Sequence, residues 1–139
     1  MAVFQREITL DTHGHGDMHR IDREVQETVT ESGIQTGTVH VFNVGSTAVI
    51  GMIEFEPGLQ RDLPEILNQL IPPGRHYGHE LAWHDGNAHS HLQATILGPS
   101  LTAPISDGRI IQGTWQQIFH LECDNKPINR TIVITVQGE

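Results

Sequence analysis

The sequence predicts a single α+β domain over residues 1–139, built mostly as an antiparallel β-sandwich with two or three helices. Several segments alternate between apolar and polar residues and are bounded by turn residues, which is typical of antiparallel strands. Only two segments carry apolar residues at helical spacing, and no repeat or low-complexity linker divides the chain. A length of 139 residues is usual for one domain with one core.

The first third of the chain predicts a strand, a loop and a helix. Residues 3–10, VFQREITL, alternate with a period of two and predict a half-buried strand. The segment DTHGHGDMH that follows is expected to be a flexible loop, able to bind metals adventitiously but too rich in glycine to be preorganised. A helix ending near Gly33 is predicted from apolar residues four apart: Ile21, Val25 and Val29.

The middle of the chain predicts two strands and a second helix. The strands lie within TGTVHVFNVGSTAVIGMIEF and break at Gly45-Ser46, and the second is apolar enough to be buried on both faces. In DLPEILNQLIPPG, Asp62 and Glu65 have the spacing of a capping box, and Pro64 falls in the expected first turn.

The C-terminal part predicts about four strands. SLTAPI, the turn SDG and RIIQGTWQQIFHLEC are typical of a hairpin, and RTIVITVQ predicts a last buried strand. The segment between them, GHELAWHDGNAHSHLQATILGPS, fits either a strand or a helix.

Composition excludes several classes of function. The net charge of −9 with only eight basic residues argues against nucleic-acid binding, which needs clustered Lys and Arg. Cys123 is the only cysteine, so an intrachain disulfide and a thiolate metal cage are excluded. No apolar run approaches the roughly 20 residues of a membrane-spanning helix, and a cytoplasmic protein is expected. Because aromatic residues make up only 5%, we expect partner subunits to cover part of the apolar surface.

The main chemical signal is the group of histidines in residues 79–91. If the segment is a strand, His89 and His91 project from one face, and His79 can complete a metal-binding triad with open positions for water or substrate. If it is a helix, His89 and His91 lie about 200° apart and cannot share an ion unless His89 lies in the entry loop. Alternatively, these histidines are exposed or hydrogen-bonded and bind nothing.

Two other motifs are weaker candidates. Ser46 and Thr47 follow Gly45 at the start of a buried strand, where hydroxyls and backbone N–H groups can hold a phosphate or carboxylate. Trp115 lies between Thr114 and Gln116, an arrangement suited to stacking and orienting a planar heterocycle. An ordinary turn explains the first motif equally well, and a core or interface tryptophan explains the second.

Four segments taken in order carry a family resemblance. They are NVGSTAVIGMIEFEPG with RDLPEILNQLIP, YGHE, NAHSHLQATILGPSLTAPISDGRIIQGTWQQI, and NRTIVITVQGE. Together they resemble the YjbQ family, often labelled secondary thiamine-phosphate synthase enzymes. The resemblance implies a compact α+β sandwich assembled as a homotrimer, with sites near subunit contacts. It also implies weak thiamine-phosphate synthase activity, in which a pyrimidine methyl diphosphate joins a thiazole phosphate and pyrophosphate is released.

The resemblance leads to a hypothesis for the site. A divalent metal, zinc by preference or magnesium with a diphosphate, is expected on His79, His89 and His91. The expected catalytic residues are Ser46, Glu54 and His79, with Glu56 or Asp62 as alternatives to Glu54. The expected substrate-binding residues are Thr47, Thr114, Trp115 and Gln116, with Arg75 and Arg109 as helpers for phosphate. This chain has Val44-Gly45-Ser46 where many members have His-Thr-Ser. Two rival hypotheses are a metal-assisted hydrolase of a small phosphorylated or carbonyl substrate, and a non-enzymatic trimeric binding protein.

Overall fold

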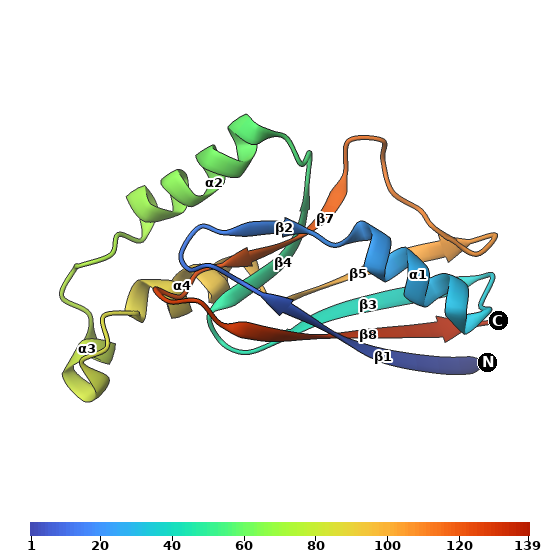
Figure 1. Ribbon diagram of the computed structural model, residues 1–139, viewed down its shortest axis with the longest axis horizontal. Coiled ribbons are helices and arrows are strands. Elements are labelled where there is room, and N and C mark those ends of the chain that lie inside the picture. The colour runs from blue at the N-terminus through green and yellow to red at the C-terminus, as the bar shows by residue number, and fades with distance from the viewer.

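Eight strands form two antiparallel sheets in the computed structural model, which describes residues 1–139 (Figure 1). The larger sheet has the strand order β1 (Ala2–Asp11), β8 (Asn129–Gly138), β3 (Gly37–Val44), β5 (Ser100–Ser106) and β6 (Arg109–Ile110). The smaller sheet has the order β2 (Met18–Arg20), β7 (Gln117–Glu122) and β4 (Ala48–Ile53). The predicted α+β class, the antiparallel pairing and the four C-terminal strands are confirmed.

Four helices are present: α1 (Asp22–Ser32), α2 (Pro57–Leu70), α3 (Gly78–Trp83) and α4 (Ala88–Leu97). The histidine-rich segment supplies two of them, which is why the number exceeds the two or three expected. As predicted, α1 ends at Gly33, whose φ of 73° lies in the left-handed region.

The start of α2 differs from the prediction. The side chain of Glu56 accepts hydrogen bonds from the backbone N–H groups of Gly58 and Leu59, so the helix begins at Pro57. Asp62 and Pro64 therefore lie inside the helix, and the predicted capping box is wrong. The earlier cap was missed because Glu is not a preferred N-cap residue.

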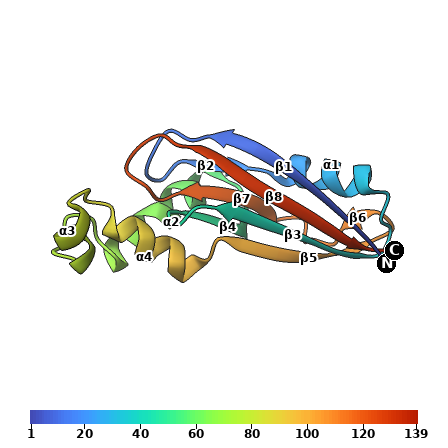
Figure 2. The same cartoon turned by 90° about the horizontal axis from the view of Figure 1, so that it is seen from below.

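The smaller sheet forms the middle layer of the domain. On one side it joins α1 against the inner face of the larger sheet, in a core cluster to which it contributes Ile50 and Ile118. On the other side it packs against α2 and α4 through a second cluster: Val49, Leu67, Ala94, Phe119, Leu121 and Cys123. Every residue of β7 is buried, as expected for the central strand of a middle layer. This arrangement leaves α3 and α4 projecting from one end of the sheets, opposite both chain termini (Figure 2).

The segment that joins β1 to β2 is fixed by backbone hydrogen bonds. Thr12 N–H donates to the carbonyl of Ile128 at 3.0 Å, and Gly16 N–H donates to the carbonyl of Glu122 at 2.8 Å. In return, Glu122 N–H donates to the carbonyl of Asp17 at 2.9 Å. The prediction of a flexible, unorganised loop here is therefore wrong.

A buried polar network ties the two sheets together beside this segment. Arg130 donates from Nε to Glu122 Oε1 at 2.8 Å, pairs through Nη2 with Glu122 Oε2, and donates from Nη2 to Thr47 Oγ1 at 2.8 Å. The hydroxyl of Thr12 donates to Glu122 Oε1 at 2.7 Å, and that of Thr47 donates to Asp124 Oδ2 at 2.9 Å. All five side chains belong to buried residues.

None of the helices is long and apolar enough to cross a membrane.

Candidate functional site

The histidines of residues 79–91 lie on α3 and α4 and in the turn between them. His89 is the second residue of α4, so both the strand alternative and the entry-loop alternative are wrong. The helix directs its two histidines to different neighbours. The ring of His91 lies 4.7 Å from that of His79, centroid to centroid, and the ring of His89 lies 5.2 Å from that of His15. The predicted triad is thus divided between two histidine pairs.

The first pair is surrounded by carboxylates. Nδ1 of His79 lies 3.3 Å from Asp85 Oδ1 and 3.6 Å from Glu80 Oε1. This nitrogen is buried and makes no hydrogen bond. Glu80 Oε1 also accepts a hydrogen bond from the N–H of Ala88 at 2.9 Å, which fixes α3 to the first turn of α4. His79, Glu80 and Asp85 therefore bring one imidazole and two carboxylates together at the α3–α4 junction, a donor set able to hold a divalent cation, and the ring of His91 lies beside it.

The second pair contains a buried, neutral imidazole. His89 is only 3% exposed. Burial lowers its pKa, and the positive charge of His15 lowers it further, against the opposing effect of the Glu80 and Asp124 carboxylates. His89 is thus available at neutral pH to accept a proton or to bind a metal.

Both ring nitrogens of His15 have hydrogen-bond partners. Its Nδ1 lies 2.7 Å from the carbonyl of Cys123, and its Nε2 lies 2.8 Å from Asn68 Oδ1. That amide oxygen also accepts from Gln93 Nε2, which donates to the carbonyl of Ile71 as well. Because the second bond fixes the orientation of both amides, His15 faces an acceptor at each nitrogen. These two contacts fix the ring of His15 beside that of His89.

The predicted heterocycle-binding residues lie elsewhere in the chain. Thr114, Trp115 and Gln116 are exposed, with Trp115 72% exposed. They belong to the connection between β6 and β7, which lies far from α3 (Figure 1). The expected convergence of histidines and indole therefore does not occur within one chain.

Neither Ser46 nor Thr47 makes a hydrogen bond to the histidines of α3 and α4. Ser46 is exposed and borders a small hollow of about 100 Å³ beside Ala94 and Thr95, too small for a substrate. Thr47 is buried and its hydroxyl bonds to Asp124 and Arg130, so it is part of the buried polar network in this structure.

Three predicted charged residues belong to none of the ligand clusters. Glu54 is exposed, and the carboxylates beside the histidines are Glu80 and Asp85 instead. The predicted phosphate helpers Arg75 and Arg109 are exposed, and Arg75 stacks over the ring of Tyr77.

Comparisons with known proteins agree over nearly the whole chain. Residues 6–139 match a family model described as UPF0047 protein YjbQ-like. The chain belongs to the UPF0047 (YjbQ-like) family. A UPF0047 protein of Methanothermobacter thermautotrophicus is 37% identical over 139 residues, covering 100% of this chain and 95% of the relative. A UPF0047 protein of Archaeoglobus fulgidus is 35% identical, covering 91% and 97%.

Solved structures give the same result for the UPF0047 fold. A YbjQ-like protein of unknown function from Sulfolobus solfataricus superposes with a TM-score of 0.93 at 34% identity, covering 99% of each chain. A hypothetical protein from Aeropyrum pernix superposes with a TM-score of 0.89 at 32% identity, covering 98% of this chain and 99% of that one. The resemblance noted in the sequence is confirmed.

Sequence reasoning missed three site residues of this UPF0047 chain. Glu80 and Asp85 stand one and six positions after His79, and their convergence depends on a short helix followed by a turn, in which His84 has a φ of 57°. His15 comes from a segment far away in sequence, and no local pattern could place it beside His89. The only available signal was the density of histidines in both segments.

Proposed function

We propose that this UPF0047 protein is a cytoplasmic, homotrimeric enzyme that uses a divalent metal to act on a small phosphorylated substrate. We further propose that its reaction is of the thiamine-phosphate synthase type, joining a pyrimidine methyl diphosphate to a thiazole phosphate with release of pyrophosphate. The observation that carries the proposal is the buried, unpartnered Nδ1 of His79, between the carboxylates of Glu80 and Asp85 and next to the ring of His91.

The donor set suits a metal that handles phosphate. Histidines alone would favour zinc-like ions, whereas diphosphate chemistry usually uses oxygen-bound magnesium. Glu80 and Asp85 add oxygen donors to the nitrogen of His79, and this mixed set accepts zinc or manganese, and magnesium if the carboxylates dominate. The ring of His91 lies beside the set. When bound, the metal would supply positive charge opposite the departing diphosphate.

The neighbouring pair can assist without contributing ligands. The ring of His15, held at both nitrogens, fixes the position of the His89 ring beside it. In the proposed reaction His89 would remain neutral, and its buried ring would help to exclude water.

The same histidine favours a second candidate function, metal-assisted hydrolysis. His89 is buried with a lowered pKa and makes no side-chain hydrogen bond through either ring nitrogen, so it can take a proton from a water molecule. A hydrolase needs this proton transfer, whereas the condensation does not.

Trimer formation is proposed from the apolar side chains left at the surface. Several exposed residues lie on α4 and on the adjoining end of β3: Leu92, Ile96, Leu97, Phe42 and Val44. Such a group is more than the single surface hydrophobes expected on a monomer. Trp115 is also exposed, and we propose that its loop contributes to the contact between subunits.

The decisive experiment incubates chelator-stripped protein with each divalent metal and both thiamine precursors, and measures thiamine phosphate and pyrophosphate. We expect product with the wild type, loss of at least tenfold in His79→Ala and His91→Ala, and wild-type rates in the matched control His40→Ala, which lies on β3. No condensation above a protein-free control would reject the synthase proposal.

Two further results would indicate the alternative functions, a hydrolase or a non-enzymatic binding protein. Phosphate release from one precursor alone would indicate the hydrolase. Metal retention without any product would indicate a binding protein. Native mass spectrometry of the wild type and of Leu92→Asp/Ile96→Asp tests the trimer, which the double variant is expected to dissociate.

A further inference from the structure

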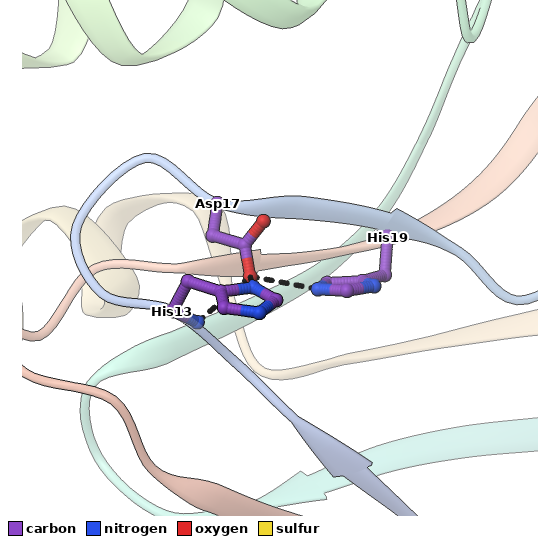
Figure 3. Close-up of side chains that lie close together, drawn as sticks. All are labelled: His13, Asp17 and His19. Carbon is purple, nitrogen blue, oxygen red and sulfur yellow. Dashed lines mark hydrogen bonds and ion pairs between the residues drawn. The ribbon is translucent and has the colours of Figure 1, made fainter.

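A second cluster of metal-ligand side chains lies where β1 passes into β2. Figure 3 shows the rings of His13 and His19 directed at the carboxylate of Asp17. Nδ1 of His13 lies 3.1 Å from Asp17 Oδ2, and Nε2 of His19 lies 2.7 Å from the same oxygen. The three ligand atoms lie within 4.8 Å of one another. Both imidazoles therefore present one nitrogen each to one carboxylate.

The backbone prearranges this cluster. Asp17 Oδ2 also accepts a hydrogen bond from the backbone N–H of His13 at 2.9 Å, and the N–H of Asp17 donates to the carbonyl of Gly14 at 3.1 Å. Three contacts, from the rings of His13 and His19 and from the backbone N–H of His13, therefore hold the Asp17 carboxylate in one position.

We propose that His13, Asp17 and His19 form a second divalent transition-metal site, separate from the one at the α3–α4 junction. Two imidazole nitrogens and one carboxylate oxygen suit zinc and its neighbours rather than calcium or magnesium. Tetrahedral zinc with bonds of about 2.0–2.1 Å keeps its ligand atoms about 3.3 Å apart. The observed separations of 2.7 and 3.1 Å need only small ring movements to reach that value.

Solvent access supports this assignment. The side chain of His13 is 81% exposed, so an ion can enter from solvent and complete its coordination with water. The side chains of Asp17 and His19 are 22% and 28% exposed, so the other two ligands are largely shielded and held in place.

Metal binding at His13, Asp17 and His19 would have a structural consequence for the proposed site at the α3–α4 junction. His15 lies between the proposed ligands in sequence, yet its ring packs beside that of His89. A metal bound to His13 and His19 would hold the segment that places the His15 ring there. The second site would therefore stabilise the fold and support the first site without taking part in its chemistry.

Metal counting separates the two sites. Chelator-stripped protein is dialysed against zinc, and bound metal is measured by mass spectrometry in the wild type, His79→Ala/His91→Ala, His13→Ala/His19→Ala and the control His40→Ala. We expect His79→Ala/His91→Ala to keep one equivalent of zinc per chain. Adding His13→Ala to that double variant should remove the remaining zinc. Cobalt, used in place of zinc, should give the visible bands of a protein-bound ion in the first variant and lose them in the second.

The zinc content and the Tm of these variants decide whether the second metal site exists. If His13→Ala/His19→Ala binds as much zinc as the wild type, or if His79→Ala/His91→Ala binds none, the second site does not exist. If the wild type binds one equivalent that is lost only with His13→Ala/His19→Ala, this site stands and the metal of the proposed function fails. Zinc should also raise the Tm of His79→Ala/His91→Ala, and Asp17→Asn, which preserves shape but removes the charge, should abolish that rise. An unchanged rise would overturn the assignment.

Discussion

The buried pair Arg130–Glu122 offers the sharpest test of how this fold is held together. The two side chains are 5% and 0% exposed, and Arg130 makes three hydrogen bonds to Glu122 and Thr47. In Arg130→Met, the Glu122 carboxylate keeps only two neutral donors, the hydroxyl of Thr12 at 2.7 Å and the N–H of Asp124 at 3.0 Å. A buried charge that loses its partner costs roughly 3–5 kcal/mol, a large part of a total stability of about 5–15 kcal/mol.

The assay is urea denaturation followed by circular dichroism, at one protein concentration because assembly affects stability. The control is Arg6→Met, which breaks an ion pair with Glu31 whose side chains are 41% and 56% exposed, and should cost about 0–1 kcal/mol. Adding Glu122→Gln to Arg130→Met removes the stranded charge, so the double variant should regain roughly 2 kcal/mol. A cost for Arg130→Met no larger than that of the control, or strictly additive losses in the double variant, would refute this reasoning.

Three further predictions concern stability and reactivity. Burial lowers the pKa of His120 to about 4, so the unfolded state binds the extra proton as pH falls from about 6.5 to 4. Stability should therefore drop by about 2 kcal/mol between pH 7 and pH 5 in the wild type, and by clearly less in His120→Gln, both measured in urea. Burial also raises the pKa of the Cys123 thiol to about 12, so a thiol reagent at pH 8 should label it only after unfolding; rapid labelling of folded protein would contradict this. A Cβ on Gly37 would lie 2.0 Å from the backbone oxygen of Gln137, so Gly37→Ala should cost roughly 1–3 kcal/mol, whereas Gly78→Ala, whose Cβ meets nothing within 4 Å, should not.

Most of the fold could be predicted because its signals are local. The alternation in β1, the apolar run of β4 and the turn at Asp107-Gly108 each report a feature set by neighbouring residues. The start of α2 could not be predicted in the same way, because the capping residue Glu56 has a weak preference for that position. The sequence therefore predicts whether a segment is a helix or a strand where its periodicity is strong. It does not predict where α2 begins, because that boundary depends on the single side chain of Glu56.

The candidate site was less predictable because it is assembled from contacts between distant segments. The sequence identified His79 and His91 as chemically important, but it could not determine whether residues 88–97 form a strand or a helix. That choice decides whether His89 joins His91 or turns to His15. Nor could it place Trp115, whose distance from the histidines follows from the strand order and not from any motif.

The segment GHGD illustrates how glycine can organise a site instead of loosening it. Gly14 and Gly16 have φ values of 122° and 86°, which ordinary residues rarely adopt. In a regular strand His13, His15, Asp17 and His19 would all point to one face, because side chains alternate with a period of two. The two left-handed glycines interrupt that alternation, so that His15 turns to His89 while the other three side chains stay together. The residues that suggested a flexible loop are therefore the ones that allow a single short segment to serve two separate histidine clusters.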